Sequence, residues 1–194
     1  MDTTLIVPGL FGSGPDHWQS WFERQIPGCA RVVQSDWSTP DLASWSAGLR
    51  HELSRAPGRV WIVAHSFGCL ATVNVVSESS ERISGLMLVA PADPARFGLE
   101  TVMSGNMPGV HSVLVASTND SWMSIDKAAA CAEAWGSELI NLGAVGHINV
   151  SSGHGAWPRG LDIYHSLRGG RASSARNIAA RSGERRSSWG TFDA

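Results

Sequence analysis

The chain has 194 residues, 43% hydrophobic residues and a formal net charge of −2 at pH 7, as expected for a globular protein with one well-formed core. Residues 1–168 carry a charge of −5, so the body of the chain offers no basic surface for a nucleic acid, whereas residues 169–194 carry +3. No apolar run is long enough to span a membrane, and the three cysteines lack the spacing of a metal site.

Six apolar or β-branched segments predict strands, and they alternate with segments of helical periodicity. The predicted strands cover residues 3–7, 30–34, 59–63, 83–90, 111–116 and 138–142, and the predicted helices cover 15–26, 40–53, 69–76, 125–135 and 158–167. This alternation indicates an α/β fold with a mainly parallel sheet of about six strands and helices on both faces.

The remaining segments predict loops and a tail. We expect one domain over residues 1–168 and a disordered tail rich in Arg, Ser and Gly over residues 169–194. Residues 91–110 show little periodicity and can hold a loop or one or two helical turns, so any lid is small; a mobile flap at 103–108 is a hypothesis. The N-terminus lacks the basic and apolar segments of a signal peptide, and we expect a cytoplasmic protein.

The segment Ala64–Gly68 joins a predicted buried strand to a predicted buried helix. A serine at such a turn, Ser66, is typical of a nucleophile elbow, in which a strained backbone lifts the hydroxyl out of the sheet. Small neighbours are needed because the turn is sharp, and Gly68 meets that need, while Ala64 replaces the usual first glycine. The pattern predicts a catalytic serine only if the chain also supplies a base, an acid and an oxyanion hole.

An acid and a base follow the fifth and sixth predicted strands. Asp120 and His147 stand in the order and positions that a Ser, Asp, His triad has in this type of sheet. His147 would accept the proton of Ser66, and Asp120 would orient the imidazole. Asp93 and His154 are competitors on neighbouring loops.

The glycine-rich loop at residues 9–14 follows the first predicted strand. It is placed to supply an oxyanion donor, so we predict that the backbone N–H groups of Leu10 and Phe67 bind the oxyanion. A dinucleotide site, with Asp36 as ribose ligand, is an alternative, but the glycine spacing departs from G-x-G-x-x-G and Asp16 would place a carboxylate where a pyrophosphate binds.

Three further aromatic or imidazole side chains are expected near Ser66. Phe11, His17 and Trp122 are candidates for the substrate pocket. His65 precedes Ser66 on the tight turn, so we expect its side chain to point away from that of Ser66 and to serve in packing.

These motifs together resemble the small serine hydrolases related to retinoblastoma-binding protein 9. The resemblance implies an α/β-hydrolase fold without a large cap domain, the triad Ser66, Asp120 and His147, and no cofactor or metal. Phe67 stands where the family more often has leucine, which predicts a narrower acyl pocket, and the tail matches nothing in the family. The matching segments are residues 7–10 (VPGL), 16–19 (DHWQ), 36–37 (DW), 64–66 (AHS), 88–91 (LVAP), 119–120 (ND), 146–149 (GHIN) and 157–158 (WP).

The sequence therefore predicts a serine hydrolase of small carboxylic esters or related acyl compounds, acting through an acyl-enzyme. A peptidase or amidase would use the same residues. The alternative from another class is a catalytically silent hydrolase scaffold that binds a protein partner.

Overall fold

A computed structural model describes residues 2–100, 107 and 109–169. Within them six parallel strands form one sheet in the order β2-β1-β3-β4-β5-β6. The predicted α/β-hydrolase sheet is confirmed. The strands are β1 (Thr3–Val7), β2 (Cys29–Arg31), β3 (Val60–His65), β4 (Ile83–Val89), β5 (Ser112–Ala116) and β6 (Glu138–Asn141).

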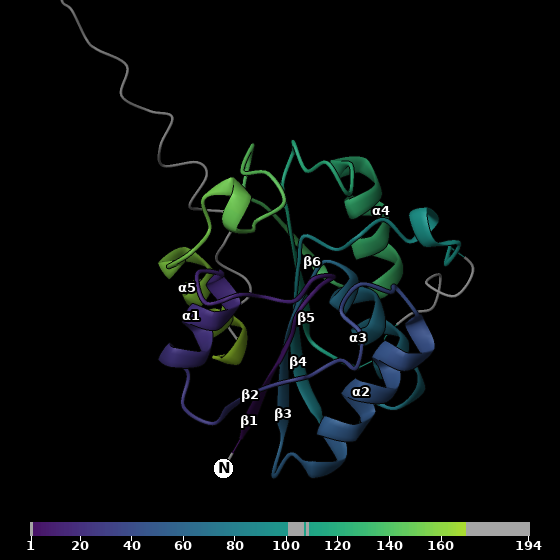
Figure 1. The fold of residues 1–194 in the computed structure, drawn as a ribbon, viewed down its shortest axis with the longest axis vertical. Coiled ribbons are helices and arrows are strands. Elements are labelled where there is room, and N and C mark those ends of the chain that lie inside the picture. Colours follow the sequence, from purple (N-terminus) through teal and green to yellow (C-terminus); the bar gives the residue numbers. More distant parts are fainter. Residues whose placement is uncertain (1, 101–106, 108, 170–194) are drawn as a thin grey trace, which may run out of the picture.

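Helices cover both faces of this sheet, as Figure 1 shows. One side carries α1 (Trp18–Gln25) and α5 (Pro158–Arg168). The other side carries α2 (Leu42–Arg55), α3 (Phe67–Glu78) and α4 (Ile125–Trp135). Two short 3₁₀ helices, η1 (Pro94–Phe97) and η2 (Val150–Ser152), lie in the loops after β4 and β6.

The strands are buried on both faces because successive side chains point to opposite sides. Leu5 and Ile62 belong to the core beneath α2, α3 and α4, while their neighbours Ile6 and Val63 belong to the core beneath α1 and α5. This arrangement explains why β1, β3 and β4 read as continuous apolar runs rather than as alternating ones.

Several predicted boundaries differ from the observed ones, among them those of α1, α2 and β2. Helix α1 begins at Trp18 rather than at Pro15, because the side chain of His17 caps it. Helix α2 begins at Leu42 rather than at residue 40, because the carboxylate of Asp41 caps it by accepting from the N–H groups of Ala43 and Ser44. Strand β2 ends at Arg31 instead of continuing to residue 34, since it is an edge strand that pairs only with β1.

The loop between β4 and β5 carries only η1 within its described residues, so no cap domain is present there. Of the predicted flap at 103–108, only Met107 belongs to the described residues, and its side chain is buried. The predicted tail, beyond Gly169, falls outside them as well.

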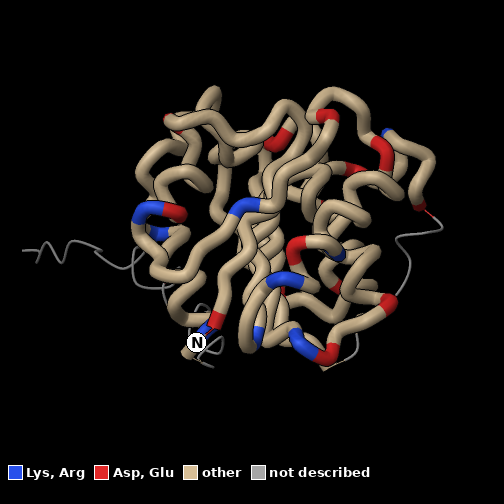
Figure 2. The backbone as a smooth tube through the Cα atoms, turned by 60° about the horizontal axis from the view of Figure 1, so that its bottom comes forward, with Lys and Arg blue, Asp and Glu red and all other residues tan. Residues whose placement is uncertain are grey.

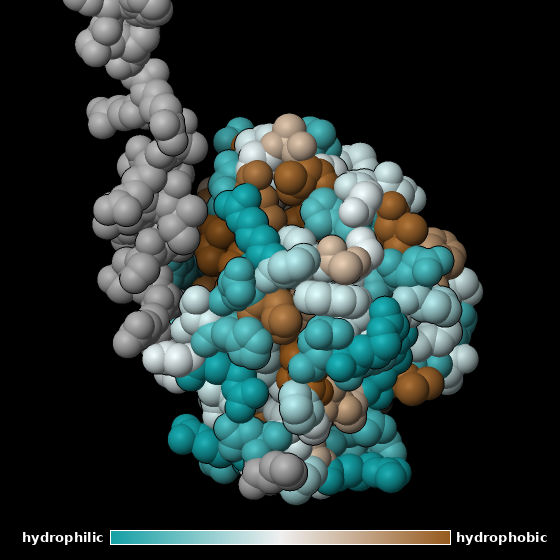
Figure 3. Space-filling model, turned by 90° about the vertical axis from the view of Figure 1, so that its left-hand side faces the viewer, coloured by the Kyte–Doolittle hydropathy of each residue, from teal (hydrophilic) through white to brown (hydrophobic). Residues whose placement is uncertain are grey.

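The surface of the described part mixes charged, polar and apolar residues. Figure 2 shows Lys and Arg interspersed with Asp and Glu along the backbone, and some of them form exposed pairs such as Arg50 with Glu78. Figure 3, which faces α1 and α5, shows hydrophobic residues in separate areas of a largely hydrophilic surface. No helix in the described ranges has the length and hydropathy needed to cross a lipid bilayer.

Candidate active site

Ser66 lies on the turn between β3 and α3 in a strained backbone conformation. Its φ of 53° and ψ of −124° lie in a region that non-glycine residues rarely adopt. The neighbouring loop after β1 fits closely against this turn, because a Cβ atom on Gly9 would lie 2.7 Å from the Cβ of Ser66. The predicted strand, turn and helix around Ser66 are therefore present, and the glycine-rich loop lies against them.

Gly68 is required by the same close approach. A Cβ atom at this position would lie 2.3 Å from the carbonyl oxygen of Pro8 and 2.7 Å from that of Val7, and backbone atoms cannot move aside as a flexible side chain can. We expect Gly68→Ala to lower the free energy of unfolding by about 1–3 kcal/mol, the usual cost of overpacking. Urea denaturation measures this change.

Gly14→Ala is the matched control for that measurement. A Cβ atom on Gly14 meets nothing within 4 Å, so this variant is expected to unfold at the wild-type urea concentration. Equal stability of the two variants would show that the approach of the β1 loop to α3 is looser than described here.

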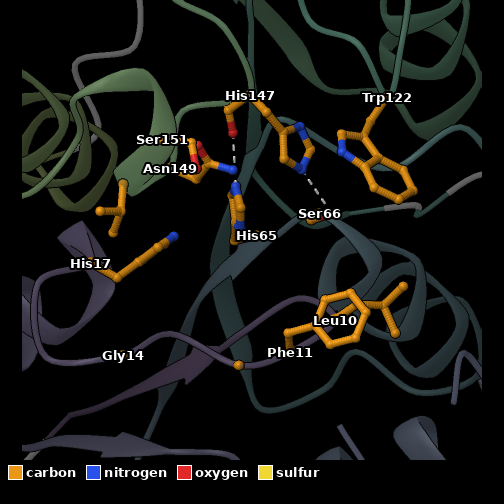
Figure 4. Close-up of a pocket in the computed structure, with 12 residues that line it drawn as sticks. Leu10, Phe11, Gly14, His17, His65, Ser66, Trp122, His147, Asn149 and Ser151 are labelled. Carbon is orange, nitrogen blue, oxygen red and sulfur yellow. Dashed lines mark hydrogen bonds between the residues drawn. The ribbon is translucent and has the colours of Figure 1, made fainter. Parts of the chain in front are cut away.

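The three predicted residues Ser66, His147 and Asp120 form one hydrogen-bonded chain. The Oγ of Ser66 lies 3.0 Å from Nε2 of His147, and Nδ1 of His147 lies 2.9 Å from both carboxylate oxygens of Asp120. The side chains of His147 and Asp120 are only 9% and 3% exposed. Figure 4 shows the His147 ring directed at Ser66.

The partners in this chain fix the tautomer of His147. A carboxylate can only accept, so Nδ1 carries the proton toward Asp120 and Nε2 presents a lone pair to the Ser66 hydroxyl. This is the tautomer that a general base requires.

The loops that carry Asp120 and His147 are tied together by Asn119. Its side-chain oxygen accepts from the N–H of Gly146 at 2.7 Å and from the hydroxyl of Ser117 at 2.9 Å. Sequence reasoning did not assign Asn119 a part in the site, although its place beside Asp120 after a strand end was a signal.

The His147 loop is also held from the α1 side. Ile148 has a φ of 48°, which is unusual for a β-branched residue, and its carbonyl oxygen accepts from the indole N–H of Trp18 at 2.8 Å. A strained residue of this kind persists only where its surroundings hold it. The burial of Trp18 under the sheet therefore contributes to the placement of His147.

His65 has more contacts than the predicted packing role implies. Its ring packs against those of His17, Trp18 and His147, and its Nε2–H donates to the carbonyl oxygen of His147 at 3.0 Å. The side chain also lines the pocket in front of Ser66, so His65 takes part in the site besides packing. Burial, followed by the charges of His147 and His17, holds the pKa of His65 well below its ordinary value.

The competing residues lie elsewhere. Asp93 caps η1 and forms an ion pair with Lys127 of α4, and His154 contacts the hydroxyl of Ser152. Asp36, considered above as a residue that could bind a ribose, accepts from the N–H and the hydroxyl of Ser38 in an exposed turn. Its carboxylate is therefore hydrogen-bonded within its own loop. None of the three takes part in the Ser66, His147 and Asp120 chain.

A pocket of about 280 Å³ opens in front of Ser66. Its lining includes all three predicted pocket residues, and the exposed Phe11 stands at its rim. The ring of Phe67 does not line it, because that ring is buried between Trp45 and Phe97, so the expected narrowing of the acyl pocket by Phe67 was wrong. The lining comprises Leu10, Phe11, Gly12, Gly14, His17, His65, Ser66, Trp122, His147, Asn149, Val150 and Ser151.

Of the two predicted oxyanion donors, Phe67 follows Ser66 in the chain and Leu10 lines the same pocket as Ser66. Phe67 is the first residue of α3, so its N–H precedes the hydrogen-bonded part of that helix. The N–H of Leu10 donates no backbone hydrogen bond within the part of the chain that the structure describes, whereas the next N–H, on Phe11, donates to Trp37. Both amides are therefore available to a ligand.

The buried histidines make stability depend on pH. Burial, followed by the charge of Arg31, lowers the pKa of His17 to about 4, so His17 is neutral in the folded protein and ionises in the unfolded chain below about pH 6.5. The unfolded state then binds more protons, and we expect the free energy of unfolding to fall between about pH 6.5 and pH 4, by up to about 1.4 kcal/mol per pH unit for this histidine.

Urea denaturation at pH 7, 6 and 5 measures this dependence. The variant His17→Asn should show a shallower decline than the wild type, and His51→Asn, which changes an exposed histidine, should not. Parallel curves for wild type and His17→Asn would contradict the low pKa of His17.

Comparison with known proteins decides the family. A family model described as serine hydrolase matches residues 4–166. The chain belongs to the serine hydrolase family. No curated protein sequence matches this serine hydrolase significantly. The predicted resemblance to small serine hydrolases of the α/β-hydrolase superfamily is confirmed.

Solved structures agree with this assignment. The serine hydrolase is 40% identical to a putative YdeN-like hydrolase from Pectobacterium atrosepticum, with 87% of this chain and 90% of that one covered and a TM-score of 0.81. The YdeN protein of Bacillus subtilis is 19% identical, with coverages of 87% and 100% and a TM-score of 0.73. Est1E of Butyrivibrio proteoclasticus, solved with ferulic acid, is 11% identical, with 95% of this chain and 90% of that one covered and a TM-score of 0.63. At this identity the likeness shows a common fold.

The described part of the serine hydrolase, residues 2–100, 107 and 109–169, contains no group of three His, Cys, Asp or Glu side chains arranged to hold a metal ion. Among the described residues, no Lys, Arg, Asp or Glu lines the pocket in front of Ser66.

Proposed function

We propose that this serine hydrolase cleaves small carboxylic esters or related acyl compounds through Ser66, His147 and Asp120. The observation that carries the proposal is the continuous hydrogen-bonded chain from the Ser66 hydroxyl through His147 to Asp120. The pocket of about 280 Å³ at Ser66 supports a small acyl group.

The reaction begins when Ser66 Oγ attacks the acyl carbon. Nε2 of His147 takes the hydroxyl proton and then gives it to the leaving oxygen, while Asp120 stabilises the imidazolium. The N–H groups of Leu10 and Phe67 bind the negative charge that forms on the carbonyl oxygen. Water, activated by His147, then attacks the acyl-enzyme and releases the acid, which restores Ser66.

Labelling with a fluorophosphonate, located by mass spectrometry, tests the proposal together with steady-state hydrolysis of p-nitrophenyl acetate and butyrate. Labelling at Ser66 with turnover supports it. Folded protein that is neither labelled nor active overturns it and favours the silent scaffold that binds a partner. A comparison with amino-acid p-nitroanilides distinguishes an esterase from a peptidase, which would use the same residues with an amine leaving group.

A further inference from the structure

His17 presents a nitrogen without a partner to the pocket. Its Nδ1 accepts from the backbone N–H of Gln19 at 3.2 Å and so caps α1. Because Nδ1 acts as an acceptor and the ring is neutral, the proton resides on Nε2. Nε2 has no hydrogen-bond partner among the residues that the structure describes, although His17 is only 5% exposed and lines the pocket.

Asn149 presents a second such group for the same reason. Its Oδ1 accepts from the N–H of Ser152 in the capping box of η2, which leaves the amide nitrogen as the free end of the side chain. This Nδ2 has no partner within the described ranges either, and Asn149 lines the same pocket. Figure 4 shows His17 and Asn149 on one side of Ser66, with Trp122 on the other.

The two caps thus have a common effect on the pocket. In both residues the acceptor atom of the side chain caps a helix. The N–H groups of His17 Nε2 and Asn149 Nδ2 therefore remain as hydrogen-bond donors on this side of the pocket. Both donors reach the solvent of the pocket, since Ser84 Oγ is the one side-chain polar atom of the described residues that is buried without a partner. A substrate oxygen can therefore replace water as their acceptor.

We propose that His17 and Asn149 bind a second carbonyl oxygen of the substrate, separate from the carbonyl that Ser66 attacks. This proposal rests on the proposed function, since it assigns a substrate class to the same site. The substrate is then an ester or related acyl compound with an additional ketone, ester or amide carbonyl in its acyl or its alcohol part.

The charge of the pocket favours a carbonyl over an anion as this second group. Among the residues that the structure describes, no Lys or Arg lines the pocket. The guanidinium of Arg31 near His17 is engaged with Glu23, Ser13 and Ser20. The guanidinium of Arg96 lies over the Trp122 ring and donates to the carbonyl oxygen of Ser121. Burial lowers the pKa of His17 to about 4, so the imidazole is a neutral donor at physiological pH. Neutral donors match a neutral acceptor without the need to desolvate a carboxylate.

Two pairs of esters test the proposal, each pair differing by one ketone in place of one methylene. The first pair is p-nitrophenyl 4-oxopentanoate with p-nitrophenyl pentanoate, and the second is 3-oxobutyl butyrate with butyl butyrate. After correction for the uncatalysed rates, we expect kcat/KM to favour the ketone about tenfold in at least one pair, as for one added hydrogen bond of about 1.4 kcal/mol.

Variants then attribute the preference to the donors. His17→Asn keeps an oxygen that can cap α1 but is too short to reach the Nε2 position, and we expect the ketone preference to disappear. Asn149→Asp keeps the cap of η2 and removes the donor, with the same expected result. His154→Asn is the matched control, because His154 does not line the pocket, and it should retain the preference.

Fluorophosphonate labelling separates this proposal from the proposed function. Labelled enzyme with equal kcat/KM within both pairs, or with a ketone preference that survives His17→Asn, overturns the assignment of the donors alone. Enzyme that is folded but not labelled overturns the proposed function and the present proposal with it.

Discussion

Replacing Ser66 with alanine is expected to lower kcat for p-nitrophenyl butyrate by about 10⁶-fold, the effect that loss of the nucleophile has in enzymes with such a triad. The variant lacks the oxygen that attacks the acyl carbon, and the Leu10 and Phe67 amides alone cannot form the acyl-enzyme. Initial rates at saturating ester, together with the loss of fluorophosphonate labelling, measure the effect. The circular dichroism spectrum should not change, because alanine leaves the same backbone and the buried environment around residue 66 in place.

Ser84→Ala is a matched control for this change. Ser84 lies in β4, away from the pocket, and its buried hydroxyl has no hydrogen-bond partner in the described structure, so its loss should leave kcat at the wild-type value. Substantial residual activity in Ser66→Ala, with normal activity in Ser84→Ala, would assign the attack to a different group.

Replacing Asp120 with asparagine is expected to lower kcat by about 10⁴-fold. Asparagine has nearly the same shape and can still accept from the N–H of Trp122, which Asp120 Oδ1 does at 2.8 Å, so the loop should keep its conformation. It carries no negative charge to stabilise the imidazolium and no second acceptor to hold His147 in the required tautomer. The decrease should therefore appear in kcat with little change in thermal stability.

Asp93→Asn distinguishes the two candidate acids. Asp93 is paired with Lys127 and its carboxylate does not contact His147, so this variant should keep kcat close to that of the wild type. A large loss of kcat in Asp93→Asn, with normal kcat in Asp120→Asn, would reverse the assignment of the acid.

The sequence was sufficient to predict the geometry of Ser66, Asp120 and His147, because each lies where a predicted parallel strand ends. Carboxyl ends of parallel strands meet at one edge of the sheet, so correct strand positions bring such residues together even when the boundaries are wrong by a few residues. The early end of β2 and the late start of α1 did not affect the prediction of these three positions.

The side chains that support the site could not be predicted in this way. The bond from Trp18 to Ile148 joins residues 130 positions apart, and the bond from His65 to His147 spans 82 positions. Strand and helix patterns carry no information about such contacts, which depend on how the α1 side packs. Phe67 shows the same limit, since its position beside Ser66 suggested a pocket residue, whereas the start of α3 turns its ring into the core.

The long sequence separations in the site also determine when it forms during folding. Ser66 and His147 are 81 positions apart, and β6, which precedes the His147 loop, is the last strand of the sheet in chain order. Contacts between distant parts of a chain form slowly because long loops must close first. On a ribosome the turn around Ser66 emerges well before His147, so the hydrogen bond between them cannot form until β6 and the loop after it have been synthesised and docked.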